Sequence, residues 1–456
     1  MTDGEQAARK LYDRSVPRNR RRQWFAGGSV PVAVYGLGKM GLPLAAVFAE
    51  TTGNVIGIDI DDRTVERIND GDCPVENEPG LPELVSVGVE TGALRATTDA
   101  GAGARAASVH VVVVPTTVTE DSVPDLSTLQ AAVESIAAGL DPGDVVLVES
   151  TVPPGTCREV VHPTLVGESD CSAGEFGLAF CPERTASGRA IADIRGAYPK
   201  VVGGVDGESR RVAELVYGEL TDNDVISTAD ATTAECVKVF EGVYRDVNIA
   251  LANELARLPA ELGVDAVEAI EVANTQPFCD IHDPGAGVGG HCIPYYPYFL
   301  IHPFKTEFPL LATAREVNDA MPEYVARLTL DRLVDAGTDP ADALVAVLGV
   351  TYRPGVAEIR ESPAVPIVAE LVGAGATTVV ADPVVGGAAG TADTDARAVT
   401  LGELSDLDLD GAVLVTAHEE FDRIDWTAFD DLVVVDGRDS LTLEDTDHDV
   451  YTVGRG

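Results

Sequence analysis

One cysteine lies in a glycine-rich stretch where its thiol could do chemistry. Cys292 closes the run Pro284-Gly285-Ala286-Gly287-Val288-Gly289-Gly290-His291-Cys292, and Pro294 stiffens the exit. Glycines this dense let the backbone come close to a ligand, and a thiol presented there can attack a carbonyl if something stabilises its thiolate. Two alternatives stay open: a small buried hydrophobic residue, or a metal site formed with Cys279, His282 and His291.

Lys238 is a second candidate for chemistry. It lies in a helical pattern between apolar residues, in Glu235-Cys236-Val237-Lys238-Val239-Phe240. Only five of the 32 basic residues are lysines, so a lysine kept here suggests a role that arginine cannot fill. A compact ammonium could neutralise an oxyanion. The alternative is an ordinary helix lysine whose head reaches the solvent.

A glycine loop near the N-terminus predicts a dinucleotide site. Gly36-Leu37-Gly38-Lys39-Met40-Gly41 follows a strand pattern at 31–35 and opens a helix. The first glycine permits a tight turn, the second admits a pyrophosphate, and the third lets helix pack on strand. Asp59 closes the second strand pattern, where it can bond the ribose hydroxyls and repel a 2′-phosphate. NAD is therefore predicted over NADP, with a tight turn that binds no ligand as the alternative.

The elements that must position these residues alternate between strand and helix. Short β-branched runs and helical patterns follow one another over 30–228 and again from 344, which indicates parallel sheets covered on both faces. Between them the pattern is helical at 229–273 and 310–336. We predict two Rossmann-like doubly wound α/β domains joined by a helical middle domain with a long central helix. The predicted divisions are an N-terminal arm at 1–29, an NAD-binding domain at 30–228, a central domain carrying the cysteine loop at 229–336, and a C-terminal α/β domain at 337–456.

Composition narrows the partners and the surroundings. The formal net charge of −43 argues against nucleic acid and is typical of a halophilic surface. No apolar run reaches the ~20 residues that cross a bilayer. Arg20-Arg21-Arg22 could pass for a twin-arginine export signal, but cleavage after it would damage the first strand and its glycine loop. We expect a cytoplasmic protein with a solvated basic arm, no membrane partner and no metal.

Together these pieces resemble the UDP-glucose/GDP-mannose dehydrogenase family, the NAD-dependent nucleotide-sugar 6-dehydrogenases. The resemblance runs from about Val32 to Arg438. Besides the features above, it rests on Glu78-Pro79-Gly80, Pro115-Thr116, Ser150-Thr151-Val152-Pro153-Pro154-Gly155-Thr156, Cys181-Pro182-Glu183-Arg184, Arg360-Glu361-Ser362-Pro363 and Asp436-Gly437-Arg438.

The resemblance implies a four-electron oxidation of a sugar C6 alcohol to a carboxylate through a thiohemiacetal and a thioester on Cys292. Lys238 would stabilise oxyanions, while Glu183 and Thr151 would position water and relay protons. NAD would contact Gly36, Gly38, Lys39, Met40, Gly41, Asp59, Arg63, Pro115, Thr116 and Thr151. The UDP-sugar would contact Glu183, Arg184, Lys238, Gly289, Gly290, Arg353, Arg360 and Arg438. The helical run at 310–336 would build a homodimer.

The sequence also departs from the family pattern. Gly242 stands where many relatives carry Asn, Tyr296 where an Asp is usual, Phe278 where an Arg reaches the partner's site, and Ser187 where one branch has Glu. Cys181–Arg184 and Tyr244-Arg245-Asp246-Val247-Asn248 favour UDP-N-acetyl-D-mannosamine as substrate. UDP-glucose, UDP-N-acetylglucosamine and GDP-mannose remain alternatives. A two-electron hydroxyacid dehydrogenase and a nucleotide-sugar-binding protein without turnover are the alternatives of other classes.

Overall fold

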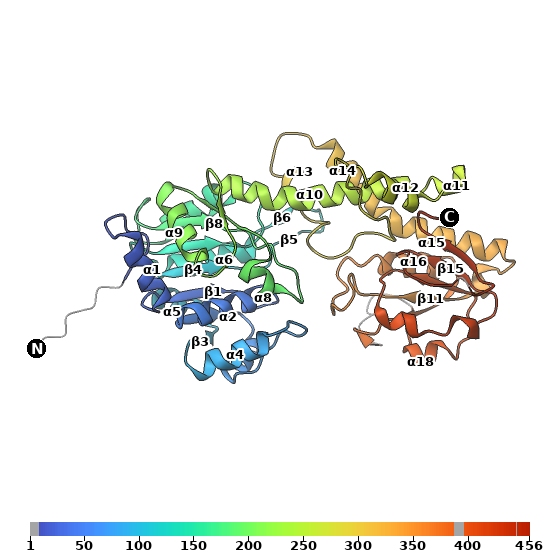
Figure 1. The fold of residues 1–456 in the computed structure, drawn as a ribbon, viewed down its shortest axis with the longest axis horizontal. Coiled ribbons are helices and arrows are strands. Elements are labelled where there is room, and N and C mark those ends of the chain that lie inside the picture. The colour runs from blue at the N-terminus through green and yellow to red at the C-terminus, as the bar shows by residue number, and fades with distance from the viewer. Residues whose placement is uncertain (1–8, 387–395, 444) are drawn as a thin grey trace, which may run out of the picture. The chain divides into compact units, whose positions relative to one another are not determined.

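Two α/β units make up the computed structural model, which describes residues 9–386, 396–443 and 445–456 (Figure 1). Unit 1 comprises Met1–Phe240 with Tyr298–Pro303, and unit 2 comprises Glu241–Pro297 with Phe304–Gly456. The boundary falls inside helix α10 (Ala231–Leu255), the longest helix among the described residues. Each unit carries its own sheet, mainly parallel in unit 1 and wholly parallel in unit 2, so the protein has the predicted fold class, two Rossmann-like α/β domains with a helical middle region.

Unit 1 is built on an eight-stranded sheet of order β10-β9-β8-β7-β4-β1-β2-β3. Neighbouring strands are parallel except β8 and β9, which are antiparallel. Because β1 pairs with β2 on one side and β4 on the other, the strand order reverses at β1, where nucleotides bind in such sheets. The strands are β1 Val32–Tyr35, β2 Val55–Ile58, β3 Leu94–Thr97, β4 Val109–Val112, β7 Val145–Val148, β8 Gly177–Phe180, β9 Lys200–Gly204 and β10 Val225–Ser227, with a separate hairpin of β5 Thr117–Val118 and β6 Pro124–Asp125.

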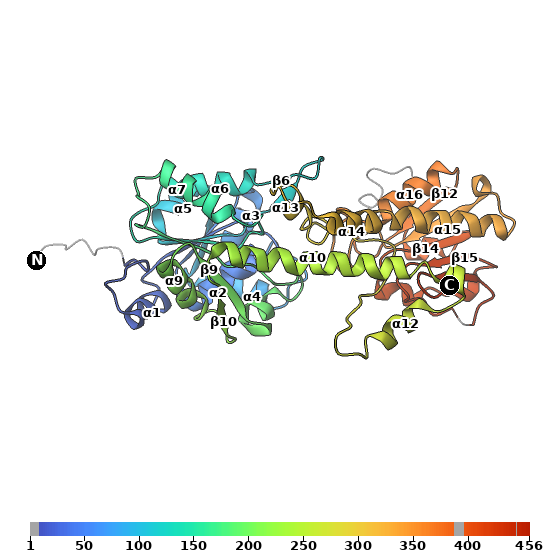
Figure 2. The same cartoon turned by 90° about the horizontal axis from the view of Figure 1, so that it is seen from above.

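Helices cover both faces of this sheet (Figure 2). Apolar side chains of α2, α4 and α9 pack on one face, and those of α6, α7 and the start of α10 pack on the other. The helical elements of unit 1 are α1 Arg18–Ala26, α2 Gly41–Thr52, α3 Asp62–Asn69, α4 Leu81–Glu90, α5 Ala100–Ala106, α6 Ser127–Ala137, α7 His162–Glu168, α8 Ala190–Ala192, α9 Gly207–Tyr217 and α13 Tyr298–Ile301, with π-helical turns η1 Cys157–Val161 and η2 Asp193–Ala197.

The basic N-terminal arm packs on unit 1, so the prediction of a solvated arm is wrong for Lys10 and Arg21, while its other described arginines from Arg14 to Arg22 are exposed. Leu11 and Phe25 are fully buried. Lys10 Nζ lies 2.6 Å from Asp144, and Arg21 pairs with buried Glu208 at 2.5 Å. The arm docks because two hydrophobic side chains anchor it and its buried cations find carboxylate partners.

Unit 2 carries a six-stranded, all-parallel sheet of order β13-β12-β11-β14-β15-β16. Helices α15 and α16 cover one face, while α18 and two short 3₁₀ turns cover the other. Its strands are β11 Leu344–Leu348, β12 Thr377–Ala381, β13 Arg397–Ala398, β14 Gly411–Leu414, β15 Val433–Asp436 and β16 Asp449–Thr452. Its helical elements beyond α10 are α11 Pro259–Leu262, α12 Ala266–Ala273, α14 Pro309–Asp319, α15 Met321–Asp335, η3 Pro340–Asp342, α16 Ala364–Gly373, α18 Leu401–Leu404, η4 Glu419–Arg423 and η5 Trp426–Ala428.

The helical run at 310–336 is two helices and not the single long helix that its pattern suggests. Helix α14 ends at Asp319 and α15 begins at Met321, with Ala320 between them. Pro322 follows at once, and a proline disfavours a continuous helix through the preceding turn. Within the described residues, no helix combines the length and the apolar character that crossing a bilayer requires.

Candidate functional site

The glycine loop of unit 1 uses each of its three glycines for a different physical reason. Gly36 has φ +90°, and a Cβ on it would lie 2.4 Å from the carbonyl oxygen of Val113. A Cβ on Gly41, at the start of α2, would lie 1.8 Å from the Gly36 oxygen. Gly38 has no atom within 4 Å of its built Cβ, which leaves open space above the loop. The loop therefore fits a pyrophosphate at Gly38 while Gly36 and Gly41 shape the turn and the packing.

Asp59 is held at the rim of this loop. Its Oδ2 accepts a hydrogen bond from the Leu37 amide at 2.7 Å, and its Oδ1 accepts from the Asp61 amide at 3.0 Å. Each carboxylate oxygen can accept a second hydrogen bond, so the group remains able to bind a ribose hydroxyl. Lys39 and Arg63, the two predicted basic contacts to the cofactor, are both exposed.

The ends of β4 and β7 bring together the Pro115-Thr116 and Thr151 segments. Thr116 Oγ1 donates to the Thr151 carbonyl at 2.6 Å, and Ser150 Oγ donates to the Val114 carbonyl at 2.8 Å. These bonds place Pro115, Thr116 and Thr151 at the carboxyl edge of the sheet, beside the β1–β4 reversal.

Glu235, on α10, holds the turn that follows Thr151. Its fully buried carboxylate accepts from the amides of Gly155 at 2.5 Å and Cys157 at 2.8 Å. Burial raises the pKa of Glu235, and the two amides oppose that rise. One helix thus carries both the anchor of the Thr151 turn and, three residues on, Lys238.

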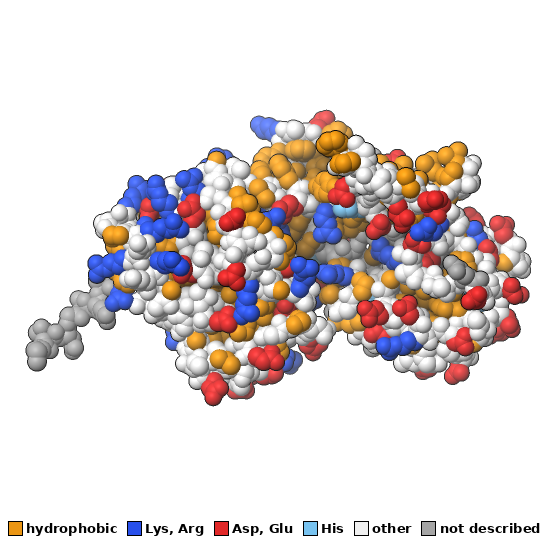
Figure 3. All heavy atoms as spheres, viewed as in Figure 1, with side chains coloured by type: hydrophobic (Ala, Val, Ile, Leu, Met, Phe, Trp, Pro, Cys, Tyr) orange, Lys and Arg blue, Asp and Glu red, His pale blue; other side chains and the backbone are white. Residues whose placement is uncertain are grey.

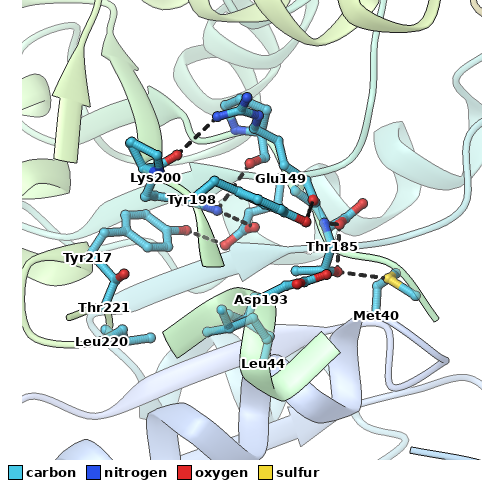
Figure 4. Close-up of a pocket in the computed structure, with 15 residues that line it drawn as sticks. Met40, Leu44, Glu149, Thr185, Asp193, Tyr198, Lys200, Tyr217, Leu220 and Thr221 are labelled. Atoms are coloured by element: carbon cyan, nitrogen blue, oxygen red, sulfur yellow. Dashed lines mark hydrogen bonds and ion pairs between the residues drawn. The ribbon is translucent and has the colours of Figure 1, made fainter. Parts of the chain in front are cut away.

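Lys238 and Glu183 meet in unit 1. Lys238 Nζ donates to the Glu183 carbonyl and lies 3.6 Å from Glu183 Oε2. Thr185 donates to Glu183 Oε1 through both its amide and, at 2.6 Å, its hydroxyl. Thr185 Oγ1 also lies 3.1 Å from Sδ of Met40, in the glycine loop (Figure 4). The carboxylate is therefore oriented, with one oxygen held by Thr185 and the other facing an ammonium.

Arg184 is used by the protein itself. Its guanidinium donates to the Pro199 carbonyl at 3.0 Å and stacks 5.5 Å from the ring centre of Tyr198. Tyr198 returns a hydrogen bond to the Arg184 carbonyl. These contacts fix the segment after β8, so the predicted substrate contact by Arg184 remains a proposal.

The cysteine loop of unit 2 packs its glycines against the chain that follows β11. A Cβ on Gly289 would lie 2.8 Å from the Glu361 oxygen, and one on Gly290 would lie 2.8 Å from the Tyr352 ring. The Gly290 amide donates to the Arg360 carbonyl at 3.1 Å. Gly289 and Gly290 are thus glycine because a backbone oxygen and a ring approach them closely. Cys292 follows this anchored stretch and is exposed.

His291 supplies a cation next to this thiol. Its Nδ1 lies 3.3 Å from Glu358 Oε1. Hydrogen bonding to the Cys292 side chain, and then to Glu358, raises the pKa of His291 to about 9. The imidazole is consequently protonated at neutral pH, and a neighbouring cation favours the thiolate form of a cysteine. His291 is therefore the candidate for the thiolate-stabilising group that the sequence left unspecified.

The three arginines predicted to contact the nucleotide differ in their surroundings. Arg353 and Arg360 are exposed, and Arg360 lies 3.8 Å from Glu358. Arg438 is engaged internally: it donates to the Val415 carbonyl at 2.6 Å and the Gly287 carbonyl at 3.1 Å. Burial lowers the pKa of Arg438. Its hydrogen bonds thus tie the cysteine loop, at Gly287, to the residue that follows β14.

Two departures from the family pattern meet in unit 2. A Cβ on Gly242 would lie 1.8 Å from Cδ2 of the buried Tyr296 ring. The absence of a side chain at 242 therefore makes room for the large ring at 296. Phe278, at a third departure, is 94% exposed.

The segment Tyr244–Asn248, which was one basis for the predicted substrate, holds neighbouring segments in place. Asn248 donates to the Asp280 carbonyl at 2.6 Å and accepts from the His282 amide at 2.8 Å. Buried Asp246 lies 2.5 Å from Arg315 and accepts from Asn318 at 2.9 Å. Within the residues that the structure describes, no group of three or more His, Cys, Asp or Glu side chains is arranged to hold a metal ion.

Sequence reasoning did not assign roles to Glu235, Thr185 or Lys200. Thr185 lies two residues after Glu183, so spacing alone was a usable signal for it, whereas the partners of Glu235 are Gly155 and Cys157, far earlier in the chain. Lys200 lies in no recognised motif, and the only sequence signal for it is that the chain has just five lysines.

Comparisons with known proteins show to which family the chain belongs. Three models of the UDP-glucose/GDP-mannose dehydrogenase family match the chain: the NAD binding domain at residues 30–221, the central domain at 232–320 and the UDP binding domain at 346–442.

Individual relatives match over nearly the whole chain. A UDP-N-acetyl-D-mannosamine dehydrogenase of Pyrococcus horikoshii is 35% identical over 93% of this chain and 99% of its own length. An NDP-N-acetyl-D-galactosaminuronic acid dehydrogenase of Ralstonia nicotianae is 36% identical over 89% and 95%. The solved structure of a UDP-D-ManNAc dehydrogenase from Pyrococcus horikoshii matches with a TM-score of 0.85 and 33% identity, over 93% of this chain and 99% of that one. The chain therefore belongs to the UDP-glucose/GDP-mannose dehydrogenase family and is an NAD-dependent oxidoreductase.

Proposed function

We propose that this protein oxidises the C6 alcohol of a nucleotide sugar to a carboxylate in two successive two-electron steps. The observation that carries the four-electron assignment is the exposed Cys292 thiol beside a His291 whose pKa is raised to about 9. An alcohol needs no covalent capture for its first oxidation. An aldehyde must gain a tetrahedral hydroxyl before a second hydride can leave, and a thiolate supplies that adduct.

The residues that would hold the cofactor line the carboxyl edge of the unit 1 sheet. The open space at Gly38 admits the pyrophosphate and Asp59 accepts from the ribose hydroxyls, while Pro115, Thr116 and Thr151 border the same edge. Lys39, Met40 and Arg63 complete the proposed contacts. Bound NAD⁺ supplies the hydride acceptor for each oxidation.

At C6, Lys238 would stabilise negative charge and Glu183 would transfer protons. The ammonium stabilises negative charge that develops on the substrate oxygen in each oxidation. The Glu183 carboxylate, oriented by Thr185, takes a proton from the water that attacks the thioester, and Thr151 relays protons at the sheet edge.

Cys292 would carry the covalent intermediates. Its thiolate adds to the C6 aldehyde carbon, and the carbonyl oxygen gains a proton to give a thiohemiacetal. Loss of hydride and of the hydroxyl proton leaves a thioester. Water then adds to the thioester carbon, the C–S bond breaks, and the products are the acid and the regenerated thiol.

We propose UDP-N-acetyl-D-mannosamine as the substrate, because relatives of this chain are named UDP-N-acetyl-D-mannosamine dehydrogenases. Identity alone does not choose among sugars, because relatives named for different sugars are 35% and 36% identical to this chain. We also propose that the substrate contacts Arg184, Gly289, Gly290, Arg353, Arg360 and Arg438.

A homodimer is also part of the proposal, and unit 2 offers a surface for it. Large hydrophobic side chains are exposed along α10, α11 and α12 and in the segments between and after them: Tyr244, Leu251, Leu258, Leu262, Val264, Val272 and Phe278. Figure 3 shows hydrophobic side chains on the surface over α11 and α12. Exposed apolar patches of this kind mark interaction sites, and a second copy of the chain is the proposed occupant. Residues 310–336, the other segment proposed for the dimer, also expose large hydrophobic side chains, Leu310 and Val334.

The decisive experiment counts NADH formed per sugar consumed, with a panel of UDP- and GDP-sugars. Two NADH per sugar support the proposal, one indicates a two-electron dehydrogenase, and none with measurable binding indicates a protein without turnover. Cys292→Ala should stop acid formation while leaving nucleotide binding nearly intact. Cys292→Ser should stall at or after the second oxidation, which mass spectrometry of quenched enzyme can detect as an ester. Acid formed by Cys292→Ala at the wild-type rate would exclude the covalent route.

A further inference from the structure

We propose that Lys200 is a positioning residue for Glu183, acting through the backbone of the segment Cys181–Thr185. The inference rests on the proposed function for what Glu183 does, but its structural basis is independent. Lys200 lies at the start of β9, and none of the hydrogen bonds, ion pairs or ring contacts that the structure describes for it reaches a segment assigned above to the cofactor. These contacts are to the segment after β8, to a buried carboxylate and to a tyrosine ring.

The segment after β8 has no regular structure, and side chains from other segments donate hydrogen bonds to its carbonyl groups. Strand β8 ends at Phe180, and residues 181–186 belong to no helix or strand. Three consecutive carbonyls accept side-chain hydrogen bonds: Pro182 from Lys200 at 3.2 Å, Glu183 from Lys238, and Arg184 from Tyr198. Because a buried carbonyl without a donor is costly, these side chains determine the path of the backbone that carries Glu183.

Lys200 is itself held by a buried cluster. Its Nζ lies 2.7 Å from Glu149 Oε2 and 4.4 Å from the centre of the Tyr217 ring. The Tyr217 hydroxyl donates to Glu149 Oε1 (Figure 4). The Lys200 side chain is 17% exposed and that of Glu149 is 2% exposed. The ammonium is therefore pinned on three sides and can hold the Pro182 oxygen in one place.

The geometry also explains why this position is a lysine in an arginine-rich chain. One nitrogen must satisfy a carboxylate, a carbonyl and a ring face at once, which suits a compact ammonium more than a planar fork. Two of the chain's five lysines, Lys200 and Lys238, bind neighbouring carbonyls of the same segment. The common feature of both is the placement of Glu183.

The test compares Lys200→Met with Lys10→Met. Lys10 is a matched control, because it pairs with buried Asp144 at 2.6 Å and its side chain is 16% exposed, yet its partners lie outside the Cys181–Thr185 segment. We expect Lys200→Met to lower kcat by about tenfold or more, a scale typical of misplacing a catalytic group by an ångström. We expect its KM for NAD to change by less than about twofold, because no NAD-binding residue is altered. Lys10→Met should keep wild-type kinetics despite a similar loss of melting temperature.

A second readout needs no turnover. Amide hydrogen exchange of residues 181–186 in the ligand-free protein should speed up in Lys200→Met and stay unchanged in Lys10→Met. Lys200→Gln, which keeps one donor, should give smaller changes and serves if the Met variant does not fold. Unchanged exchange of this segment, or equal kinetic losses in the Lys200 and Lys10 variants, would overturn the proposal. If wild-type protein forms no NADH with any sugar, the proposed function fails while the exchange measurement still decides the role of Lys200.

Discussion

A Cβ added to Gly242 would lie 1.8 Å from Cδ2 of Tyr296, whose ring is buried. Glycine inside a helix is unfavourable by about 0.5–1 kcal/mol relative to alanine, so the sequence accepts that cost in the middle of α10 to make room for a ring. The two departures from the family pattern are thus one structural change.

The first prediction concerns this pair. Gly242→Ala should lower the free energy of unfolding by about 1–3 kcal/mol, because overpacking outweighs the gain in helix propensity. In a Tyr296→Ala background the same substitution should be neutral or stabilising. Chemical denaturation of the four proteins measures the coupling between the two positions.

Gly373, the last residue of α16, is a matched control for the pair. It has no atom within 4 Å of a built Cβ, so Gly373→Ala should cost no stability. Equal effects of Gly242→Ala with Tyr296 present and absent would show that the two residues are not coupled.

The second prediction concerns the pH dependence of Cys292. The pKa of His291 is raised to about 9, so its cation is present at neutral pH and is lost as the pH rises through about 9. Glu358→Gln removes one cause of this rise and returns the pKa of His291 towards its ordinary value of about 6.5. At pH 8 the variant should therefore alkylate more slowly at Cys292 than the wild type, because the thiolate has lost its neighbouring cation.

Peptide mass spectrometry after iodoacetamide treatment measures this rate at several pH values. Cys279, in the same unit, provides an internal control whose alkylation should not change. Identical pH profiles at Cys292 in both proteins would exclude an influence of the His291–Glu358 contact on the thiol.

The third prediction tests the ribose contact of Asp59. Asp59→Asn should weaken NAD binding by about 1–3 kcal/mol, since charge-assisted hydrogen bonds to the ribose become weaker. It should also narrow the preference for NAD over NADP, because a negative charge no longer faces the 2′ position. Calorimetric titration with both cofactors measures the effect, and Asp62→Asn at the exposed start of α3 is the control. An unchanged affinity would mean that Asp59 contacts only the loop.

The fourth prediction concerns salt. With a net charge of −43, and acidic side chains spread over the face of unit 2 that Figure 3 shows, folding and activity should require molar KCl or NaCl. At 0.1 M salt the Debye length is ~10 Å, so repulsion between surface carboxylates returns and stability falls. Melting temperature and activity measured from 0.1 to 3 M KCl test this, and full activity with an unchanged melting temperature at 0.1 M would contradict it.

Much of the fold could be predicted because its signals are local. The apolar runs at 32–35, 145–148 and 344–348 form central strands, in keeping with the strand patterns predicted over 30–228 and from 344, since strands buried on both faces need continuous apolar side chains. Strand β3 at Leu94–Thr97 escaped prediction because it alternates polar and apolar residues over only four positions. The docking of the N-terminal arm depended on Glu208 and Asp144, distant carboxylates that no local pattern reveals.

The sequence by itself determined the family, the cofactor and the residue types that could do the chemistry, because motif spacing within one loop or one strand-to-helix turn is a local property. Tertiary structure alone decided how those residues are supported. It placed Glu235 against the Thr151 turn, Lys200 on the Pro182 carbonyl and Glu358 beside His291. Each of these contacts joins residues that are distant along the chain and depends on how strands and loops pack, so spacing in the sequence does not predict it.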